Sequence, residues 1–352
     1  MAIPENFDPN AVGNPHNNIF GLPFTEEEAR VVLLPVPWEV SVSYAAGTAR
    51  APENIFKASL QVDLSDDDVT DGWKHGIFMR EMNKSILQKS DYLRKEAELY
   101  INYITEGEIV SENKFMCKVI RDLNEGGRFL NQWVYEQTRD LLEAGKLVGL
   151  VGGDHSTPLG FYKAIAEKHG DFGILQIDAH ADLREAYENL TYSHASIMFN
   201  ALNEIPQLKK LVQVGTRDYS AGELDYINGS EGRVKTFFDK QLKERSYEGE
   251  TWKVLTDEIV AALPQKVYLS FDIDGLDPKL CPNTGTPVQG GFETQQVYYL
   301  LRKVLESGRQ LIGFDLNEVG TSNTEWDENV GARILFKLCN LLIASSLKNG
   351  AV

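Results

Sequence analysis

The sequence contains three short apolar runs, and each ends in a string of residues that can bind metal. The run at 146–151 ends in Gly-Gly-Asp-His-Ser, the run at 172–177 in Asp-Ala-His-Ala-Asp, and the run at 267–271 in Asp-Ile-Asp. Apolar runs of this length are typical of buried parallel strands. Open parallel α/β sheets bind ligands at the carboxyl ends of their strands. The pattern therefore predicts such a sheet, with one polar site at its carboxyl edge.

The second and third strings carry metal-capable side chains at alternate positions. Because strand side chains repeat on one face every second residue, Asp178, His180 and Asp182 can point the same way if the backbone stays extended. The same holds for Asp272 and Asp274. Buried carboxylates need a cation to offset their desolvation, so the strings predict a metal site.

The first string adds an imidazole, which gives a set of two imidazoles and four carboxylates. The candidate ligands are His155, Asp178, His180, Asp182, Asp272 and Asp274. Oxygen-rich donors with some imidazole favour manganese over a structural zinc site, and two carboxylates can bridge a metal pair. A water bound between the ions would be acidified to hydroxide. For any single aspartate, a helix cap or a turn is the simpler interpretation, but the three strings together favour metal.

Strand and helix patterns alternate along most of the chain. Strands are predicted at 31–36, 146–151, 172–178, 211–216, 267–272 and 311–316, and helices at 132–147, 158–168, 294–305 and 331–347. This alternation is typical of parallel βαβ units with right-handed crossovers, and one doubly wound α/β domain is the simplest account. Residues 1–30 are predicted to form an N-terminal arm, and residues 62–129 a helical insertion of unknown role.

Composition excludes several classes of protein. The net charge of −17 argues against a nucleic-acid partner, since phosphate binding relies on clustered Lys and Arg, and it mildly favours cationic substrates. Three cysteines, Cys117, Cys281 and Cys339, have no paired spacing, so we expect no disulfide framework and a reducing cytoplasm. The start of the sequence lacks a basic segment followed by an apolar stretch, and no apolar run approaches a membrane span. We expect a soluble, cytoplasmic protein with no membrane partner.

These motifs resemble those of the ureohydrolases, the arginase and agmatinase group of binuclear manganese enzymes. The three signatures stand in order as GGDHS at Gly152, DAHAD at Asp178 and SFDIDGLDP at Ser270. The resemblance runs from the loop after Pro35 to the last helix, and residues 62–129 are its least covered part. It implies the arginase-type fold, a three-layer α/β/α sandwich around a parallel sheet. It also implies a homo-oligomer, a trimer or a hexamer.

The resemblance implies two Mn²⁺ ions per subunit and a role for each ligand. His155 and Asp182 would hold one ion, and His180 and Asp274 the other. Asp178 and Asp272 would bridge both, and Asp182 counts as a catalytic residue as well as a ligand. Asp154 resembles an outer carboxylate that orients the ligands or the loop.

The implied reaction is hydrolysis of a guanidinium group to urea and an amine. Glu318, just past the predicted strand at 311–316, matches the carboxylate that binds the planar NH groups. His194, in Tyr-Ser-His-Ala-Ser, matches the histidine that carries a proton to the leaving amine. Both residues are therefore predicted to be catalytic and to contact substrate.

Loops would contact the substrate tail, the part of the substrate beyond the guanidinium group. For these loops the sequence leaves several alternatives open. The string Leu-Arg-Glu-Ala-Tyr-Glu from Leu183 resembles one branch of the agmatinases, so agmatine, hydrolysed to putrescine in polyamine biosynthesis, is preferred over arginine. Glu185 or Glu188 would face the cationic tail. A guanidino acid held by Arg184, free guanidine in a closed pocket, and formiminoglutamate are the alternatives. The chain also departs from the family pattern at Cys281, at Asn283 and at 320–328, all near the mouth of the site.

Two further classes stay open at the level of sequence. One is a deacylase of the same general fold with a single zinc ion, which is disfavoured because all six ligands are present. The other is a non-catalytic scaffold that retains a structural metal. The presence of both His194 and Glu318 argues against this scaffold.

Overall fold

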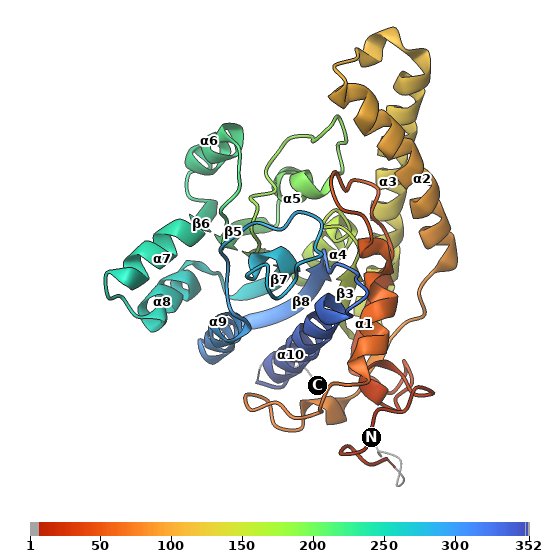
Figure 1. The fold of residues 1–352 in the computed structure, drawn as a ribbon. Coiled ribbons are helices and arrows are strands. Elements are labelled where there is room, and N and C mark those ends of the chain that lie inside the picture. The colour runs from red at the N-terminus through yellow and green to blue at the C-terminus, as the bar shows by residue number, and fades with distance from the viewer. Residues whose placement is uncertain (1–6, 349, 351–352) are drawn as a thin grey trace.

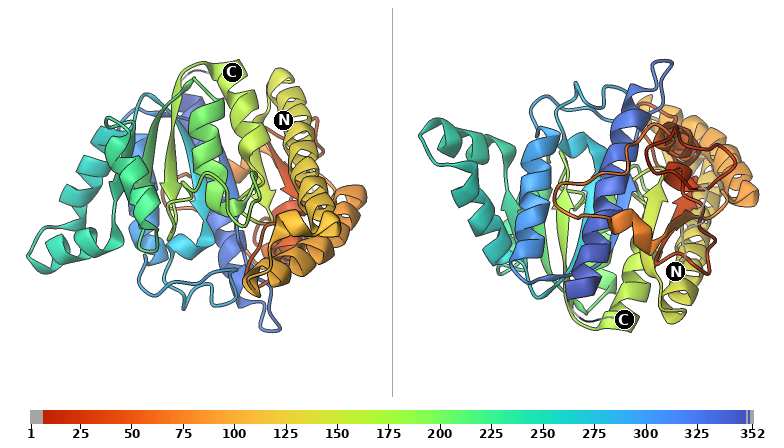
Figure 2. Two further views of the ribbon diagram at one scale, coloured as in Figure 1. Left: turned by 90° about the horizontal axis from the view of Figure 1, so that it is seen from above. Right: turned by 90° about the horizontal axis from the view of Figure 1, so that it is seen from below.

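The computed structural model describes residues 7–348 and residue 350. Within these residues, eight parallel strands form one sheet in the order β2-β1-β3-β8-β7-β4-β5-β6. The strands are β1 (Val31–Val36), β2 (Ile77–Met79), β3 (Leu147–Gly152), β4 (Phe172–Ile177), β5 (Leu208–Val214), β6 (Val234–Phe237), β7 (Lys266–Asp272) and β8 (Gln310–Asn317). Helices cover both faces of this sheet (Figures 1 and 2), which confirms the predicted three-layer α/β/α sandwich.

Two apolar cores lie on opposite faces of the sheet because successive strand side chains point to opposite sides. Val31 and Leu33 of β1 belong to one core, and Val32 and Leu34 to the other. The helices are α1 (Ala51–Ser59), α2 (Lys84–Thr105), α3 (Lys114–Glu143), α4 (Leu159–His169), α5 (Ile197–Glu204), α6 (Ala221–Gly229), α7 (Asp239–Tyr247), α8 (Trp252–Ala262), α9 (Thr294–Glu306) and α10 (Trp326–Lys348). The first core is covered by α1, α8, α9 and α10, and the second by α2, α3, α4 and α5. Each fully buried Val or Leu contributes roughly 1.5–3 kcal/mol to folding.

The strand order brings the three metal-capable strings together. After β3 the chain skips two positions to form β4, continues outward to β5 and β6, and returns to fill the gap with β7 and β8. The central neighbours are therefore β3, β8, β7 and β4, and all pair in parallel. Since parallel strands end at the same edge, the residues after these four strands meet in one place.

Most of the predicted elements lie within a few residues of the observed ones, and one boundary was wrong. The strand at 31–36 matches β1, but the helix predicted at 132–147 is only the second half of α3, which begins at Lys114 and ends at Glu143. The Asn113 side chain caps α3 by accepting hydrogen bonds from two backbone N–H groups. A pair of glycines, Gly126 and Gly127, interrupts the apolar pattern of α3, and at Gly126 a Cβ would approach Leu93 of α2 to 2.4 Å. Gly126 thus allows α2 and α3 to pack closely, Gly127 lies against Tyr192, and neither glycine ends the helix.

The helices α2 and α3 form a long hairpin, which we call the helical hairpin, beside the edge of the sheet (Figure 1). It accounts for most of the predicted insertion at 62–129, which also contributes the edge strand β2. The hairpin contacts two loops that follow strands, at 37–47 and at 183–193. Ser90 Oγ accepts from the N–H of Glu39 at 3.0 Å, and Asn124 Oδ1 accepts from the N–H of Thr191 at 2.7 Å. The insertion therefore braces both loops.

Two terminal regions complete the fold. Residues 1–6 of the predicted N-terminal arm lie outside the described residues, and further along the arm Ile19, Phe20 and Leu22 are buried in the first core. Among the described helices, α10 alone is long and apolar enough to cross a membrane by length and composition. However, 83% of its apolar window is buried inside the protein. It packs against β8 and α1, as a core helix does.

Candidate metal centre and active site

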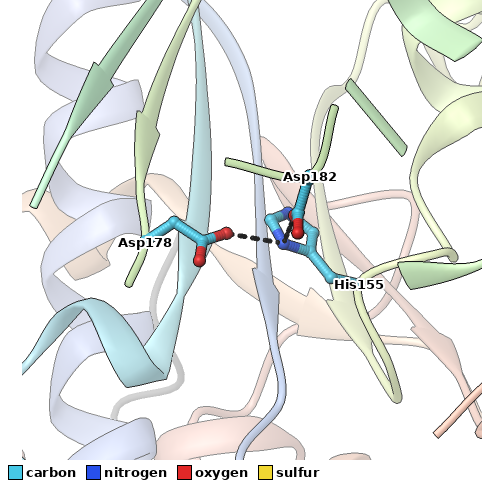
Figure 3. Close-up of side chains that lie close together, drawn as sticks. All are labelled: His155, Asp178 and Asp182. Carbon is cyan, nitrogen blue, oxygen red and sulfur yellow. Dashed lines mark ion pairs between the residues drawn. The ribbon is translucent and has the colours of Figure 1, made fainter. Parts of the chain in front are cut away.

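The loop after β3 turns sharply to bring His155 over the sheet edge. The N–H of Asp154 donates to the carbonyl of Trp38 at 2.8 Å, and a Cβ at Gly153 would lie 1.7 Å from that carbonyl oxygen. Only glycine allows this close approach. The result is that His155 Nδ1 lies 3.0 Å from carboxylate oxygens of both Asp178 and Asp182 (Figure 3).

The backbone that carries the second string is not extended, contrary to the sequence prediction. Strand β4 ends at Ile177, before the first ligand, and Asp182 has a left-handed φ of 55°. Likewise Asp274 lies in a short 3₁₀ helix, η6 (Ile273–Gly275), which begins directly after β7. The candidate ligands therefore converge because of the geometry of loops and turns. They do not converge because side chains alternate along an extended strand. A left-handed φ in a residue other than glycine is a strain typical of functional sites.

All six candidate ligands meet at this edge, in two groups that share one aspartate. His155 Nδ1 also lies 3.2 Å from Asp272 Oδ2, which completes the first group. In the second group His180 Nδ1 lies 3.0 Å from Asp274 Oδ2 and 3.6 Å from Asp178 Oδ1. Asp178 thus turns one oxygen to each histidine, which is the arrangement that a bridging carboxylate adopts between two ions.

The donor set fits a pair of divalent cations. His155 Nδ1 is buried and, although three carboxylate oxygens lie nearby, it has no hydrogen-bond partner within the described part of the chain. Ligand atoms on bonds of about 2.1 Å at right angles lie about 3.0 Å apart, as these do. Burial raises the pKa of Asp182 to about 7 and that of Asp272 well above its usual range. Buried carboxylates at this density stay ionised at neutral pH only if cations neutralise them.

Buried polar groups behind His155 fix its orientation, and the sequence analysis missed them. His155 Nε2 lies 2.8 Å from Ser270 Oγ, which donates to Asp315 Oδ1 at 3.0 Å. Because Ser270 uses its proton on Asp315, it accepts from His155 Nε2–H and leaves Nδ1 free for a metal. On the other side Gln176 Nε2 donates to Asp178 Oδ2 at 2.8 Å. The available signal was a polar residue inside an apolar strand, as with Gln176 in β4 and Asp315 in β8.

Glu318 follows β8 directly and turns one oxygen into the site without a partner. Its φ of 60° is left-handed, and its Oε1 accepts from the N–H of His155 at 2.8 Å. Its Oε2 is buried with no hydrogen-bond partner among the described residues. A Cβ at Gly285 would lie 3.1 Å from Oε2. Burial, reinforced by the charge of Asp154, raises the pKa of Glu318 well above its usual range. A cationic donor is the group that would satisfy this oxygen.

His194 begins the short 3₁₀ helix η5 (His194–Ser196) and lies beside this cluster. Its Nδ1 is 3.2 Å from Ser41 Oγ, and its ring meets that of Tyr187 edge to face with 6.0 Å between ring centroids. Burial lowers the pKa of His194 to about 4, so the imidazole is neutral at neutral pH. Asp154 accepts hydrogen bonds from Ser41 and Ser156 through its two carboxylate oxygens. No pattern in the sequence pointed to Ser41.

The residues proposed for the substrate tail lie in different environments. The guanidinium of Arg184 stacks over the ring of Tyr187 at 4.9 Å, and its Nε is 3.7 Å from the buried carboxylate of Glu223. Glu185 is exposed, whereas Glu188 is half-buried, and burial raises its pKa against the opposing charge of Arg94. The positive charge of Arg184 is therefore already partly offset by the carboxylate of Glu223.

The parallel α/β fold and the buried cluster of six metal-capable side chains indicate a metal-dependent enzyme, and comparison with known proteins gives the family. The chain matches the arginase family over residues 29–340 and belongs to it. It is therefore an arginase-family ureohydrolase, a hydrolase that cleaves amidino C–N bonds of guanidino compounds.

Several relatives match over most of their length. The N(1)-aminopropylagmatine ureohydrolase of Thermus thermophilus is 31% identical over 316 residues, which cover 90% of this chain and 91% of the relative. The agmatinase of Bacillus anthracis is 27% identical over 295 residues, covering 83% and 84%. Among solved structures, proclavaminate amidino hydrolase from Streptomyces clavuligerus has a TM-score of 0.72 at 21% identity, covering 95% of this chain and 99% of that one. The agmatine ureohydrolase of Thermoplasma volcanium has a TM-score of 0.68 at 21% identity, with 93% of each chain covered. The two solved structures confirm the predicted arginase-type fold.

Proposed function

We propose that this ureohydrolase converts agmatine to urea and putrescine with two Mn²⁺ ions per subunit. The observation that carries the proposal is the buried, unpartnered Oε2 of Glu318 beside a cluster of six metal-capable side chains. A guanidinium has donors for this oxygen and a carbon that the metal site can attack.

The two groups of ligands support the proposed division of the metal pair. His155 and Asp182 would hold one ion, His180 and Asp274 the other, and Asp178 and Asp272 both. Oxygen donors dominate, which favours manganese over metals that select thiolates. When bound, the ion pair supplies a water acidified to hydroxide near neutral pH.

The remaining site residues would bind and orient the substrate and move its protons. Glu318 would hold two NH groups of the planar guanidinium, which fixes its carbon for attack. His194 would deliver a proton to the leaving amine nitrogen, because an amine leaves only after protonation. Asp182 would act as a ligand and would also orient the attacking water. Glu318 and Asp182 are buried, which excludes bulk water around them and strengthens each of their polar contacts.

The surroundings of the substrate tail support a cation over a carboxylate. Arg184, the residue that would hold a guanidino acid, lies 3.7 Å from Glu223 and stacks on Tyr187, so its charge is partly neutralised. Glu185 and Glu188 are acids on the same loop, and the chain as a whole has a net charge of −17. These features favour agmatine over arginine, guanidinobutyrate and formiminoglutamate. We also propose that the chain is a single ureohydrolase domain, active in the cytoplasm as a homo-oligomer in polyamine biosynthesis.

The test is urea release by the purified, manganese-loaded enzyme from a panel of substrates. The panel contains agmatine, N(1)-aminopropylagmatine, arginine, guanidinobutyrate and free guanidine, with formamide release from formiminoglutamate measured beside it. We expect kcat/KM for agmatine to exceed that of each carboxylate-bearing substrate by at least about tenfold, the discrimination that one unpaired buried charge gives. The Asp178→Asn variant controls for contaminating activity. A preference for a guanidino acid or free guanidine would contradict agmatine as the proposed substrate. Absence of turnover for every compound in the panel would contradict the proposed activity.

A further inference from the structure

Asp154 stands next to a candidate metal ligand, yet both of its oxygens are hydrogen-bonded to serines. Its Oδ2 accepts from Ser41 Oγ at 2.8 Å and from the N–H of Ser41 at 3.1 Å. Its Oδ1 accepts from Ser156 Oγ and from the N–H of Ser156, the latter at 3.0 Å. Asp154 is fully buried and Ser41 is 2% exposed. The carboxylate therefore holds the loop after β1 and does not point at the metal site.

Ser41 connects this carboxylate to His194. A serine hydroxyl has a single proton, and the 2.8 Å contact of Ser41 Oγ with Asp154 Oδ2 directs that proton to the carboxylate oxygen, which also accepts from the N–H of Ser41. The lone pairs of Ser41 Oγ are left for His194, whose backbone N–H lies at 2.9 Å and whose ring Nδ1 lies at 3.2 Å. The backbone contact fixes the start of η5 relative to Ser41. The ring contact requires Nδ1 to carry a proton.

We infer that Asp154, acting through Ser41, holds His194 in the tautomer with its proton on Nδ1, so that Nε2 is free to receive and pass on a proton. The inference rests on the proposed role of His194 as the group that protonates the leaving amine. It makes Ser41 and Asp154 positioning residues for that histidine. The chain thereby orients a histidine through a hydroxyl, as other enzymes do directly through a carboxylate.

The tautomer matters because the imidazole is neutral when it starts the reaction. A neutral imidazole has one N–H, so a proton on Nε2 would leave no basic nitrogen on the side of the ring that faces away from Ser41. One competing contact exists, since Ser193 Oγ lies 3.4 Å from His194 Nδ1 and could donate to it. That distance is longer than the 3.2 Å contact with Ser41, and Ser193 Oγ, which accepts from the N–H of Ala195 at 3.3 Å, keeps a second lone pair that can accept from a protonated Nδ1.

The first test observes the tautomer directly and does not depend on which substrate is used. Full-length protein, labelled with ¹⁵N in its histidine rings and loaded with diamagnetic Zn²⁺, is studied by solid-state NMR, in which protonated and unprotonated ring nitrogens resonate far apart. The His194→Asn variant assigns the signal. We expect a protonated Nδ1 in the wild type and in Ser41→Thr, and loss of this preference in Ser41→Ala. Ser43→Ala, on the same loop, is the matched control and keeps the wild-type spectrum. A proton on Nε2 in the wild type, which needs no variant, would overturn the inference, and so would an unchanged tautomer in Ser41→Ala.

The second test separates orientation from binding. We expect Ser41→Ala to lower kcat by about a hundredfold, the size of a general-acid contribution, with KM within about twofold of the wild type and metal content unchanged. Ser41→Thr should restore most of kcat because it keeps the hydroxyl. Equal kcat values for wild type and Ser41→Ala would contradict the inference. An enzyme inactive on the whole substrate panel would overturn the proposed function, while the NMR result would still decide the tautomer.

Discussion

The metal end of the site and the loops around its substrate end are built by different parts of the molecule. The candidate ligands lie at or just after the carboxyl ends of β3, β4 and β7, three of the four central strands, and their positions depend on sheet order. The loops at 37–47 and 183–193 are instead braced by the helical hairpin, which lies outside the sheet. The contrast indicates that one scaffold can keep its metal chemistry constant while changes in the hairpin alter how the substrate is held.

The largest effect is expected from replacing Asp178, the aspartate that both ligand groups share. We expect Asp178→Asn to weaken metal binding by more than about 100-fold. Loss of a residue that only hydrogen-bonds to a metal ligand typically lowers metal affinity 10–100-fold, and Asp178 is itself a candidate ligand. Activity should fall with it. The measurement is bound Mn²⁺ per chain at fixed free Mn²⁺, together with the rise in Tm on adding metal. Asp277→Asn, in the SFDIDGLDP signature but with its carboxylate accepting from the N–H of Lys279 in a turn, is the matched control. Wild-type metal content in Asp178→Asn would contradict the assignment of a bridging ligand.

A second change tests the substrate end while leaving the metals in place. Glu318→Gln should lower kcat/KM by about 10–100-fold, since a hydrogen bond to a charged group contributes about 1.5–3 kcal/mol. Metal content should stay at the wild-type level, because the glutamine oxygen can still accept from the N–H of His155. Glu325→Gln is the control, an exposed glutamate with a similar left-handed φ of 55°. Loss of metal in Glu318→Gln would mean that this residue belongs to the metal end.

The brace from the helical hairpin gives a smaller expected effect. Asn124 accepts from the N–H of Thr191 at 2.7 Å and donates to the carbonyl of Asn189 at 3.1 Å. We expect Asn124→Ala to reduce the free energy of unfolding by about 1–3 kcal/mol and to raise KM, with metal content unchanged. Denaturant unfolding and steady-state kinetics measure the two effects. Asn102→Ala, at an exposed position of α2, should change neither quantity. An unaltered KM in Asn124→Ala would mean that the hairpin stabilises the fold without holding the substrate loop.

The smallest effect is expected at the amino edge of the sheet, remote from both ends of the site. Burial, with the charges of Lys266 and Lys168, lowers the pKa of His169 to about 4. A depressed pKa in the folded state stabilises the fold above the unfolded value near 6.5, and this contribution is lost as pH falls from there towards 4. His169→Gln should therefore remove part of the decline in Tm over that pH range. His16→Gln, at an exposed position, is the control. An identical pH dependence of Tm in wild type and His169→Gln would contradict the prediction.

The sequence patterns predicted the class of sheet and the positions of most central strands, because buried parallel strands appear in a sequence as apolar runs. They failed for the weaker elements. The edge strand β2 has three residues and β6 has four, too few for a pattern. The predicted helix began at 132, whereas α3 begins at Lys114; Gly126 and Gly127 interrupt its apolar pattern, and in the fold Gly126 allows contact with Leu93 of α2. Ser41 was missed because a serine in a loop has no pattern at all.

Sequence alone indicated which residues can take part in the chemistry: the six candidate ligands and Glu318 stand at or just past the ends of apolar runs, and His194 came from the family resemblance. Tertiary structure decided how they meet. The return of β7 and β8 between β3 and β4 brings residues more than a hundred positions apart within about 3 Å, a juxtaposition that no local pattern contains. The left-handed turns at Asp182 and Glu318 likewise depend on surrounding contacts that offset their strain. Local sequence specifies donor chemistry and strand ends, whereas strand order and packing fix the distances on which catalysis depends.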